Sequence, residues 1–142
     1  MILSQVVVML FLILCSYLDV KYRKIHVSVY LMFMLMSAVV VACAGRTDWG
    51  TLMIGMIPGI IMIVISFISH EKIGYGDSVS IALMGILYKY EMVLSVCAVG
   101  FEIIFLASFI MLVTGKAKLC DRLPFMPFLM AGNVWVVLAG VV

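Results

Sequence analysis

Six long apolar runs, separated by short polar stretches, constrain the fold of this chain more than any other feature. Their approximate ranges are 2–18, 26–44, 51–69, 77–90, 92–114 and 124–141. A helix needs about 20 apolar residues to cross a bilayer core, and most of these runs approach that length. Hydrophobic residues make up 67% of the chain and charged residues 11%, against about 45–50% and about 25% in soluble domains. We therefore predict an all-α, polytopic transmembrane bundle of about six spans, with residues 1–142 as one membrane-embedded domain.

Charge and cysteine usage argue against several classes of partner. The net charge of +2 is too small to indicate nucleic-acid binding. The cysteines form no C-x-x-C pair, and His26 and His70 belong to no H-E-x-x-H pattern, so we expect no zinc site. We expect no metal and no other cofactor. The four cysteines are Cys15, Cys43, Cys97 and Cys120.

The basic residues predict an orientation. Seven of the nine Lys and Arg fall in the first, third and fifth polar stretches, and two fall in the second and fourth. Short basic loops stay on the cytoplasmic side of a membrane. We therefore expect both termini outside and the residues next to the first, third and fifth stretches on the cytoplasmic side. The seven are Lys21, Arg23, Lys24, Lys72, Lys116, Lys118 and Arg122.

Two aspartates stand at the ends of apolar runs on that predicted cytoplasmic side. Asp19 follows the first run, and Asp77 opens the fourth after Gly74-Tyr-Gly76. An ionisable residue near hydrocarbon is costly, so it is a functional-site hypothesis by default. Two neighbouring carboxylates share a proton and can supply both the base and the acid for peptide hydrolysis. Glycine accepts positive φ and permits close approach, which suits a loop beside such a pair.

Each aspartate also has a simpler interpretation. Asp77 can be the N-cap of the fourth helix. Asp19 can be an interfacial ion-pair partner of Lys21 or Arg23. For each aspartate taken alone, the simpler interpretation is favoured over catalysis.

The fourth run is short. Only 11 residues, Ser78–Tyr88, precede Lys89, and at about 1.5 Å per residue they cross about half of a bilayer core. Either this helix begins at depth with the Ile73–Asp77 loop drawn into the protein, or it begins earlier, near Ile73.

Three segments resemble the prepilin peptidase family, the membrane aspartyl proteases of the G-x-G-D type. Asp19-Val-Lys-Tyr-Arg23-Lys-Ile25 is similar to the family's D-x-x-x-R-x-I-P-N. Gly74-Tyr-Gly76-Asp77 is similar to its G-x-G-D, which presenilin-like proteases share. Leu123-Pro-Phe-Met-Pro127-Phe-Leu129 looks like its late P-F-x-P-F/Y-L segment.

The resemblance implies an activity. It makes Asp19 and Asp77 the catalytic pair of an aspartic endopeptidase in the inner (cytoplasmic) membrane. Such an enzyme removes the leader from a type IV pilin, Flp-type pilin or preflagellin precursor, on the cytoplasmic side of a hydrophobic helix. The chain looks like the short form without a methyltransferase region. His26-Val27 and Val79 depart from the family's Pro-Asn and lysine, which concerns substrate contacts.

Charged residues and glycines near that pair are further candidates. Arg23, Lys21 and Lys24, with Gly74 and Gly76, are candidates for supporting the motifs or binding substrate. Glu102, near the middle of the fifth run, is expected to face the bundle or a polar pocket, or to be protonated. If Glu102 joined the two aspartates in a relay, a proton-coupled transporter would be the alternative function. A non-catalytic scaffold of a secretion system is a further alternative.

Overall fold

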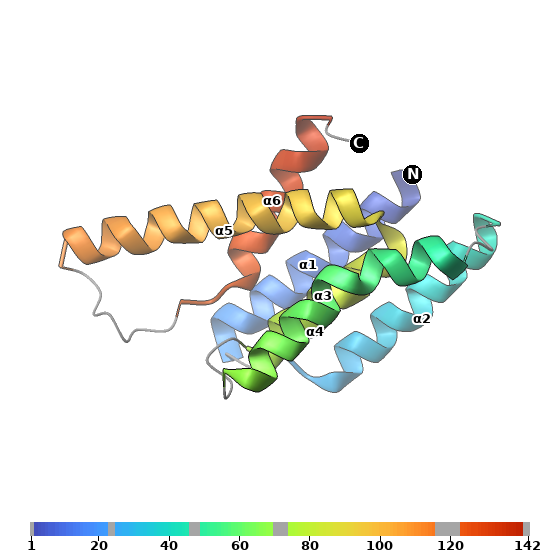
Figure 1. Ribbon diagram of the computed structural model, residues 1–142, viewed down its shortest axis with the longest axis horizontal. Coiled ribbons are helices and arrows are strands. Elements are labelled where there is room, and N and C mark those ends of the chain that lie inside the picture. The colour runs from blue at the N-terminus through green and yellow to red at the C-terminus, as the bar shows by residue number, and fades with distance from the viewer. Residues whose placement is uncertain (1, 23–24, 46–48, 70–73, 116–122, 141–142) are drawn as a thin grey trace.

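Six helices make up the described part of the chain. The computed structural model describes residues 2–22, 25–45, 49–69, 74–115 and 123–140. These ranges contain no β-strand, so the predicted all-α class is confirmed (Figure 1). The helices are α1 (Ile2–Tyr22), α2 (Val27–Cys43), α3 (Trp49–Ile68), α4 (Tyr75–Leu87), α5 (Tyr90–Val113) and α6 (Met126–Leu138).

Two helix boundaries near the aspartates differ from the apolar runs. α1 continues past residue 18 to Tyr22, and α4 begins at Tyr75, between the two predicted starts. An apolar run marks the residues that can lie in the hydrocarbon core. A helix can extend beyond that run, because its backbone hydrogen bonds do not require apolar side chains. Asp19 and Asp77 are therefore helical residues, one in the last turn of α1 and the other in the first turn of α4.

Glycine ends two helices where the sequence predicted an end. α2 is followed by Gly45 at φ 61° and α5 by Gly115 at φ 68°. Both lie two residues beyond the last helical residue, at the position where a left-handed residue commonly closes a helix.

Within the described residues, three helices are long and apolar enough to cross a membrane by themselves. These are α1, α3 and α5, with 21, 20 and 24 residues. α2 has 17 residues, and α4 and α6 have 13 each. A 13-residue helix rises about 20 Å, less than the roughly 30 Å hydrocarbon core. The protein is thus a polytopic membrane bundle in which long and short helices alternate.

Small residues bring α3 and α4 into backbone contact. A methyl group added at Gly55 would collide with the Gly85 carbonyl, and one added at Gly59 would collide with the backbone of Ala82. Gly55 and Gly59 thus allow the two helix backbones to approach closely. Such small-residue contacts are typical of membrane helices, because lipid supplies no hydrophobic drive for association. α5 and α6 meet similarly, with Gly132 against the Val96 carbonyl.

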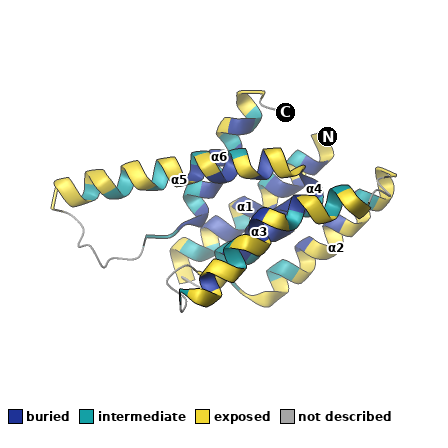
Figure 2. Ribbon diagram, viewed as in Figure 1, coloured by how far each residue is buried: buried dark blue, intermediate teal, exposed yellow. Residues whose placement is uncertain are grey.

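The core lies on the inward faces, and large apolar side chains cover the outside. Figure 2 shows buried residues where helices face one another and exposed residues elsewhere, including most of the outer half of α5. Leu35 on α2 and Phe105 on α5 are 71% and 69% exposed. Soluble monomers rarely expose such large contiguous apolar patches, whereas lipid requires them. The core includes Val8, Leu12, Cys15, Ile81, Met84, Val93, Val96, Met126 and Leu129.

Candidate active site

The two aspartates predicted from the sequence lie close enough for their carboxyl charges to interact. Asp19 comes from the C-terminal end of α1 and Asp77 from the N-terminal end of α4. Both are half-buried. Cys15 is buried one turn before Asp19, and the Tyr30 hydroxyl of α2 donates to the carbonyl of Gly76, the residue before Asp77. Three helices therefore bring one polar cluster together inside an apolar bundle.

α6 approaches Asp19 with its first residue. The backbone N–H of Met126 donates a hydrogen bond to Oδ2 of Asp19, with the nitrogen and oxygen 3.3 Å apart. The first N–H groups of a helix have no acceptor within the helix, and the N-terminal end carries partial positive charge. Phe125, just before this residue, packs on Phe101 of α5 with 5.1 Å between ring centroids. The Leu123–Leu129 segment therefore places a helix start against Asp19.

The two glycines before Asp77 leave space for two different groups. A Cβ atom at Gly74 would lie 2.9 Å from Oδ2 of Asp77, and one at Gly76 would lie 2.8 Å from the Tyr30 hydroxyl oxygen. Gly74 has φ −61°, and neither glycine is among the positive-φ glycines of the described ranges. Their role is close approach, and the expectation that positive φ would matter here is wrong.

The N-cap interpretation of Asp77 is also wrong. The N-cap of α4 is Gly74, and Asp77 is the third helical residue. The backbone N–H groups of Asp77 and Ser78 donate to the Gly74 carbonyl at 3.1 and 3.3 Å. No side-chain hydrogen bond caps this helix, so its start does not depend on the Asp77 carboxyl as a cap.

A carbonyl next to Asp77 receives two side-chain hydroxyls. The Tyr30 hydroxyl donates to the Gly76 carbonyl at 3.1 Å, and the Ser80 hydroxyl donates to the same oxygen at 2.8 Å. Ser80 is fully buried. Sequence reasoning missed Tyr30 and Ser80. A serine one turn beyond Asp77 in an apolar run was a usable signal for Ser80, and nothing comparable marked Tyr30.

Lys21 turns away from Asp19. Its ammonium group donates to the Tyr17 hydroxyl at 3.0 Å and lies 5.4 and 5.3 Å from the ring centroids of Tyr17 and Tyr22. Residues two apart on a helix do not face each other, whereas residues four apart do. The proposed ion pair between Asp19 and Lys21 is therefore wrong. Arg23 and Lys24 lie outside the described residues.

Glu102 does not join the aspartates. It is exposed on α5, so the expectation that it faces the bundle is wrong. The buried residues of α5 follow a helical stripe through Val93, Val96 and Gly100, and position 102 falls off that stripe. Among the described residues, no group of three or more His, Cys, Asp or Glu is arranged to hold a metal ion.

This geometry allows acid–base chemistry by carboxyl groups. Two interacting carboxyls hold one proton between them most easily, because both cannot ionise without repulsion. One can then accept a proton from water while the other donates one.

Comparison with known proteins identifies the family. No curated protein and no solved structure matches the chain. The model of the type IV leader peptidase family matches residues 6–115. That range contains both aspartates and the G-x-G-D segment but not the Leu123–Leu129 segment, which the structure places against Asp19. The chain belongs to the type IV leader peptidase family.

Proposed function

We propose that this peptidase is an aspartic endopeptidase in which Asp19 and Asp77 are the catalytic pair. The observation that carries the proposal is that α1 and α4, helices far apart in sequence, pack together with Asp19 in the last turn of one and Asp77 in the first turn of the other. Half-buried carboxyls in an otherwise apolar bundle are candidates for a functional site. Family membership supports the peptidase activity, and the geometry supports the assignment of these two residues.

The proposed reaction needs only the two carboxyls and water. The ionised carboxyl takes a proton from water as the water oxygen attacks the scissile carbonyl carbon. The protonated carboxyl donates its proton to the developing oxyanion. Collapse of the tetrahedral intermediate breaks the C–N bond: the protonated carboxyl donates its proton to the leaving amine, and the other carboxylate takes a proton from a hydroxyl of the intermediate as the C=O bond re-forms. The pair returns to its starting charge.

The proposed substrate is a type IV pilin-like precursor with a leader before a hydrophobic helix. We propose that Asp19 and Asp77 lie at the cytoplasmic face of the inner membrane, with both termini outside, and the distribution of basic residues supports this orientation. The position of the pair at helix ends suits a scissile bond just before a membrane helix. The apolar outer faces would then receive that helix from within the bilayer. We propose that a single membrane-embedded domain performs the whole reaction.

Co-expression with a precursor of this kind tests the proposal. Cleavage is followed by the mobility shift of the precursor and by the new N-terminus. Wild type is compared with Asp19→Asn and Asp77→Asn, variants that keep size and remove the ionisable carboxyl. Glu102→Gln is the matched control, because it neutralises an exposed carboxyl on α5.

We expect both aspartate variants to lose at least about 10³-fold in cleavage rate, as removal of an essential acid or base usually does. Glu102→Gln should cleave like wild type. Retained cleavage in either aspartate variant, with the variant still in the membrane, would rule out the pair. A requirement for Glu102 would instead favour the proton-relay alternative.

A further inference from the structure

We propose that Tyr30 is a positioning residue for Asp77, and that Gly76 is glycine because the Tyr30 hydroxyl occupies the space a side chain would need. This inference deepens the proposed function, on which it rests. It assigns a role to α2, which carries neither aspartate.

The hydrogen bonds on the Gly76 carbonyl carry the first part of the inference. Tyr30 reaches it from α2 at 3.1 Å, and Ser80 reaches it from the next turn of α4 at 2.8 Å. The Ser80 bond is internal to α4 and cannot fix that helix relative to a neighbour. The Tyr30 bond joins α2 to the peptide unit immediately before Asp77. It therefore holds the first turn of α4, and with it the carboxyl, relative to the rest of the bundle.

Packing fixes the Tyr30 hydroxyl in place. The Tyr30 ring lies edge-on to Phe11 of α1, with 6.4 Å between centroids. Phe11 in turn stacks on Phe33 of α2, with centroids 4.0 Å apart. An aromatic ring with such neighbours has little freedom to turn away. A hydroxyl so held can define the position of a backbone carbonyl.

The same hydroxyl also occupies the space that a side chain at position 76 would need. The nearest atom to a Cβ at this position is the Tyr30 hydroxyl oxygen at 2.8 Å, a distance at which something must shift. The next nearest is Cδ1 of Ile25 at 3.9 Å, an ordinary contact. The phenolic oxygen is thus the single close obstacle to a methyl group. Removing that oxygen should make alanine acceptable at position 76.

Tyr30 is half-buried beside the turn that carries Asp77. Its hydrogen bond goes to the Gly76 carbonyl, so its role is to act through Asp77.

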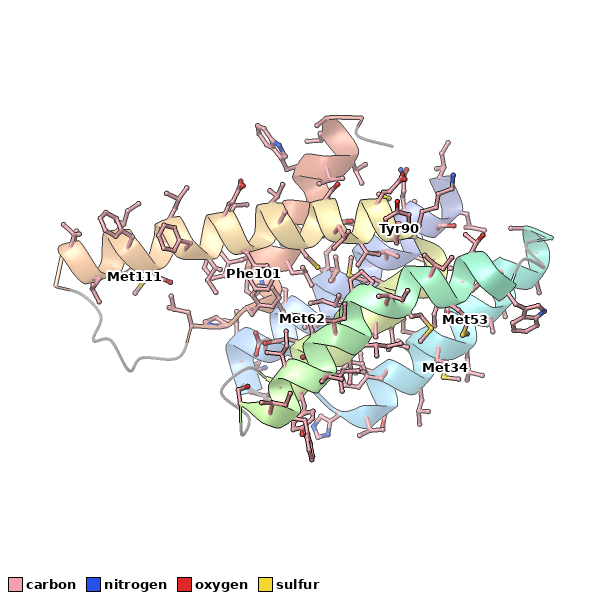
Figure 3. All side chains as sticks on the ribbon, in the orientation of Figure 1. Met34, Met53, Met62, Tyr90, Phe101 and Met111 are labelled. Atoms are coloured by element: carbon pink, nitrogen blue, oxygen red, sulfur yellow. The ribbon has the colours of Figure 1, made fainter. Side chains whose placement is uncertain are left out.

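A double-mutant experiment on the full-length enzyme tests this relation. The variants are Tyr30→Phe, Gly76→Ala and the two combined. Tyr90→Phe is the control, because it removes a hydroxyl from an exposed tyrosine beyond the other end of α4 (Figure 3). kcat and KM are measured on a pilin-like precursor, and thermal unfolding is measured on the same preparations.

We expect Tyr30→Phe to lower kcat about fivefold with little change in KM, the size expected for one neutral hydrogen bond. Gly76→Ala should lower kcat at least about 30-fold, because the turn that carries Asp77 must shift. The combined variant should recover to within about twofold of Tyr30→Phe alone. Its thermal unfolding should likewise recover relative to Gly76→Ala. Tyr90→Phe should match wild type.

Two results would overturn the inference. One is wild-type kcat in Tyr30→Phe. The other is equal impairment by Gly76→Ala in both backgrounds, for kcat and for unfolding. Failure of the proposed function is separately visible, because Asp77→Asn would then retain cleavage while the unfolding measurements still report the steric relation.

Discussion

The two aspartates lie together, but their surroundings hold them in opposite ways. Asp19 sits in the last turn of α1 and receives a donor from another helix, the Met126 N–H. Asp77 sits in the first turn of α4, and its place depends on room left by glycine and on a tyrosine that fixes the preceding carbonyl. One carboxyl is held by a bond it accepts, and the other by the shape of the backbone around it.

This difference explains why the surroundings of Asp77 can be recognised in the sequence and those of Asp19 cannot. A glycine that makes room is a residue type at a fixed spacing, so the Gly74-Tyr-Gly76-Asp77 segment can be read directly. A backbone N–H is present at almost every position, so the donor to Asp19 leaves no mark of its own. Only the prolines around Met126 indicate that a helix starts there.

Among variants that change the surroundings of one aspartate, Gly74→Ala should cause the largest loss of kcat. The added methyl would lie 2.9 Å from Oδ2 of Asp77, and the flexible carboxyl can move aside. Since φ −61° suits alanine, the fold should be unaffected. We expect a loss of about 10²-fold in kcat, which a displacement of about 1 Å can cause, with unfolding unchanged.

Tyr75→Ala is the matched control for that variant. Tyr75 is adjacent in sequence and 38% exposed, so its truncation should leave kcat within about twofold of wild type. A Gly74→Ala enzyme with normal kcat would show that the space beside Asp77 is not required.

Replacing the Met126 amide with a backbone ester should have the next largest effect. The ester keeps the side chain and removes the N–H that donates to Asp19. A hydrogen bond to a charged group contributes about 1.5–3 kcal/mol, and at 3.3 Å the lower value applies. We expect about a tenfold fall in kcat. Met126→Ala keeps the N–H but removes a fully buried side chain. We therefore expect this variant to lose more stability than activity. A larger loss of kcat in Met126→Ala than in the ester variant would show that the Met126 N–H does not support Asp19.

Tyr88→Phe should affect stability and spare the site. The Tyr88 hydroxyl at the end of α4 donates to Oδ1 of Asn133 on α6 at 3.1 Å, and both side chains are buried. Removing it leaves a buried acceptor without its donor, at a cost of about 1–3 kcal/mol. Asp77 lies at the opposite end of α4, so kcat should change less than about threefold. A large kcat effect with normal unfolding would mean that this contact, too, controls the aspartates.

The smallest effect is expected from Lys21→Met. Its ammonium group contacts Tyr17 and Tyr22 and points away from Asp19. Cleavage should change less than about twofold, measured beside Tyr17→Phe, which removes only the hydroxyl partner of the lysine. A tenfold loss confined to Lys21→Met would require a direct role with substrate, since Asp19 is not its partner.

Much of the fold followed from where the apolar runs break. Six runs predicted six helices, and Gly45 and Gly115 mark two of the ends. The boundaries at Tyr22 and Tyr75 were missed, because polar residues can continue a helix beyond the hydrocarbon. The lengths of α4 and α6 show that not every run crosses a bilayer alone.

Only part of the candidate site could be predicted from the sequence. Two aspartates in an otherwise apolar chain are conspicuous, and the structure brings their charges together. Tyr30 and the Met126 N–H reach the site across the bundle, and such contacts depend on helix packing that no local pattern encodes. Glu102 was conspicuous for the same reason as the aspartates, yet it is exposed. Whether a residue is buried depends on which face of its helix packs against neighbours, and residue type alone does not determine that face.

The glycine contact between α3 and α4 has a mechanical consequence. Where Gly55 meets Gly85 and Gly59 meets Ala82, backbone touches backbone with no layer of side chains between them. Backbone packing of this kind leaves no room between the two helices for even a methyl group. A side chain added at Gly55 or Gly59 would therefore push α4 away from α3. That displacement would be passed along α4 to its first turn, which carries Asp77.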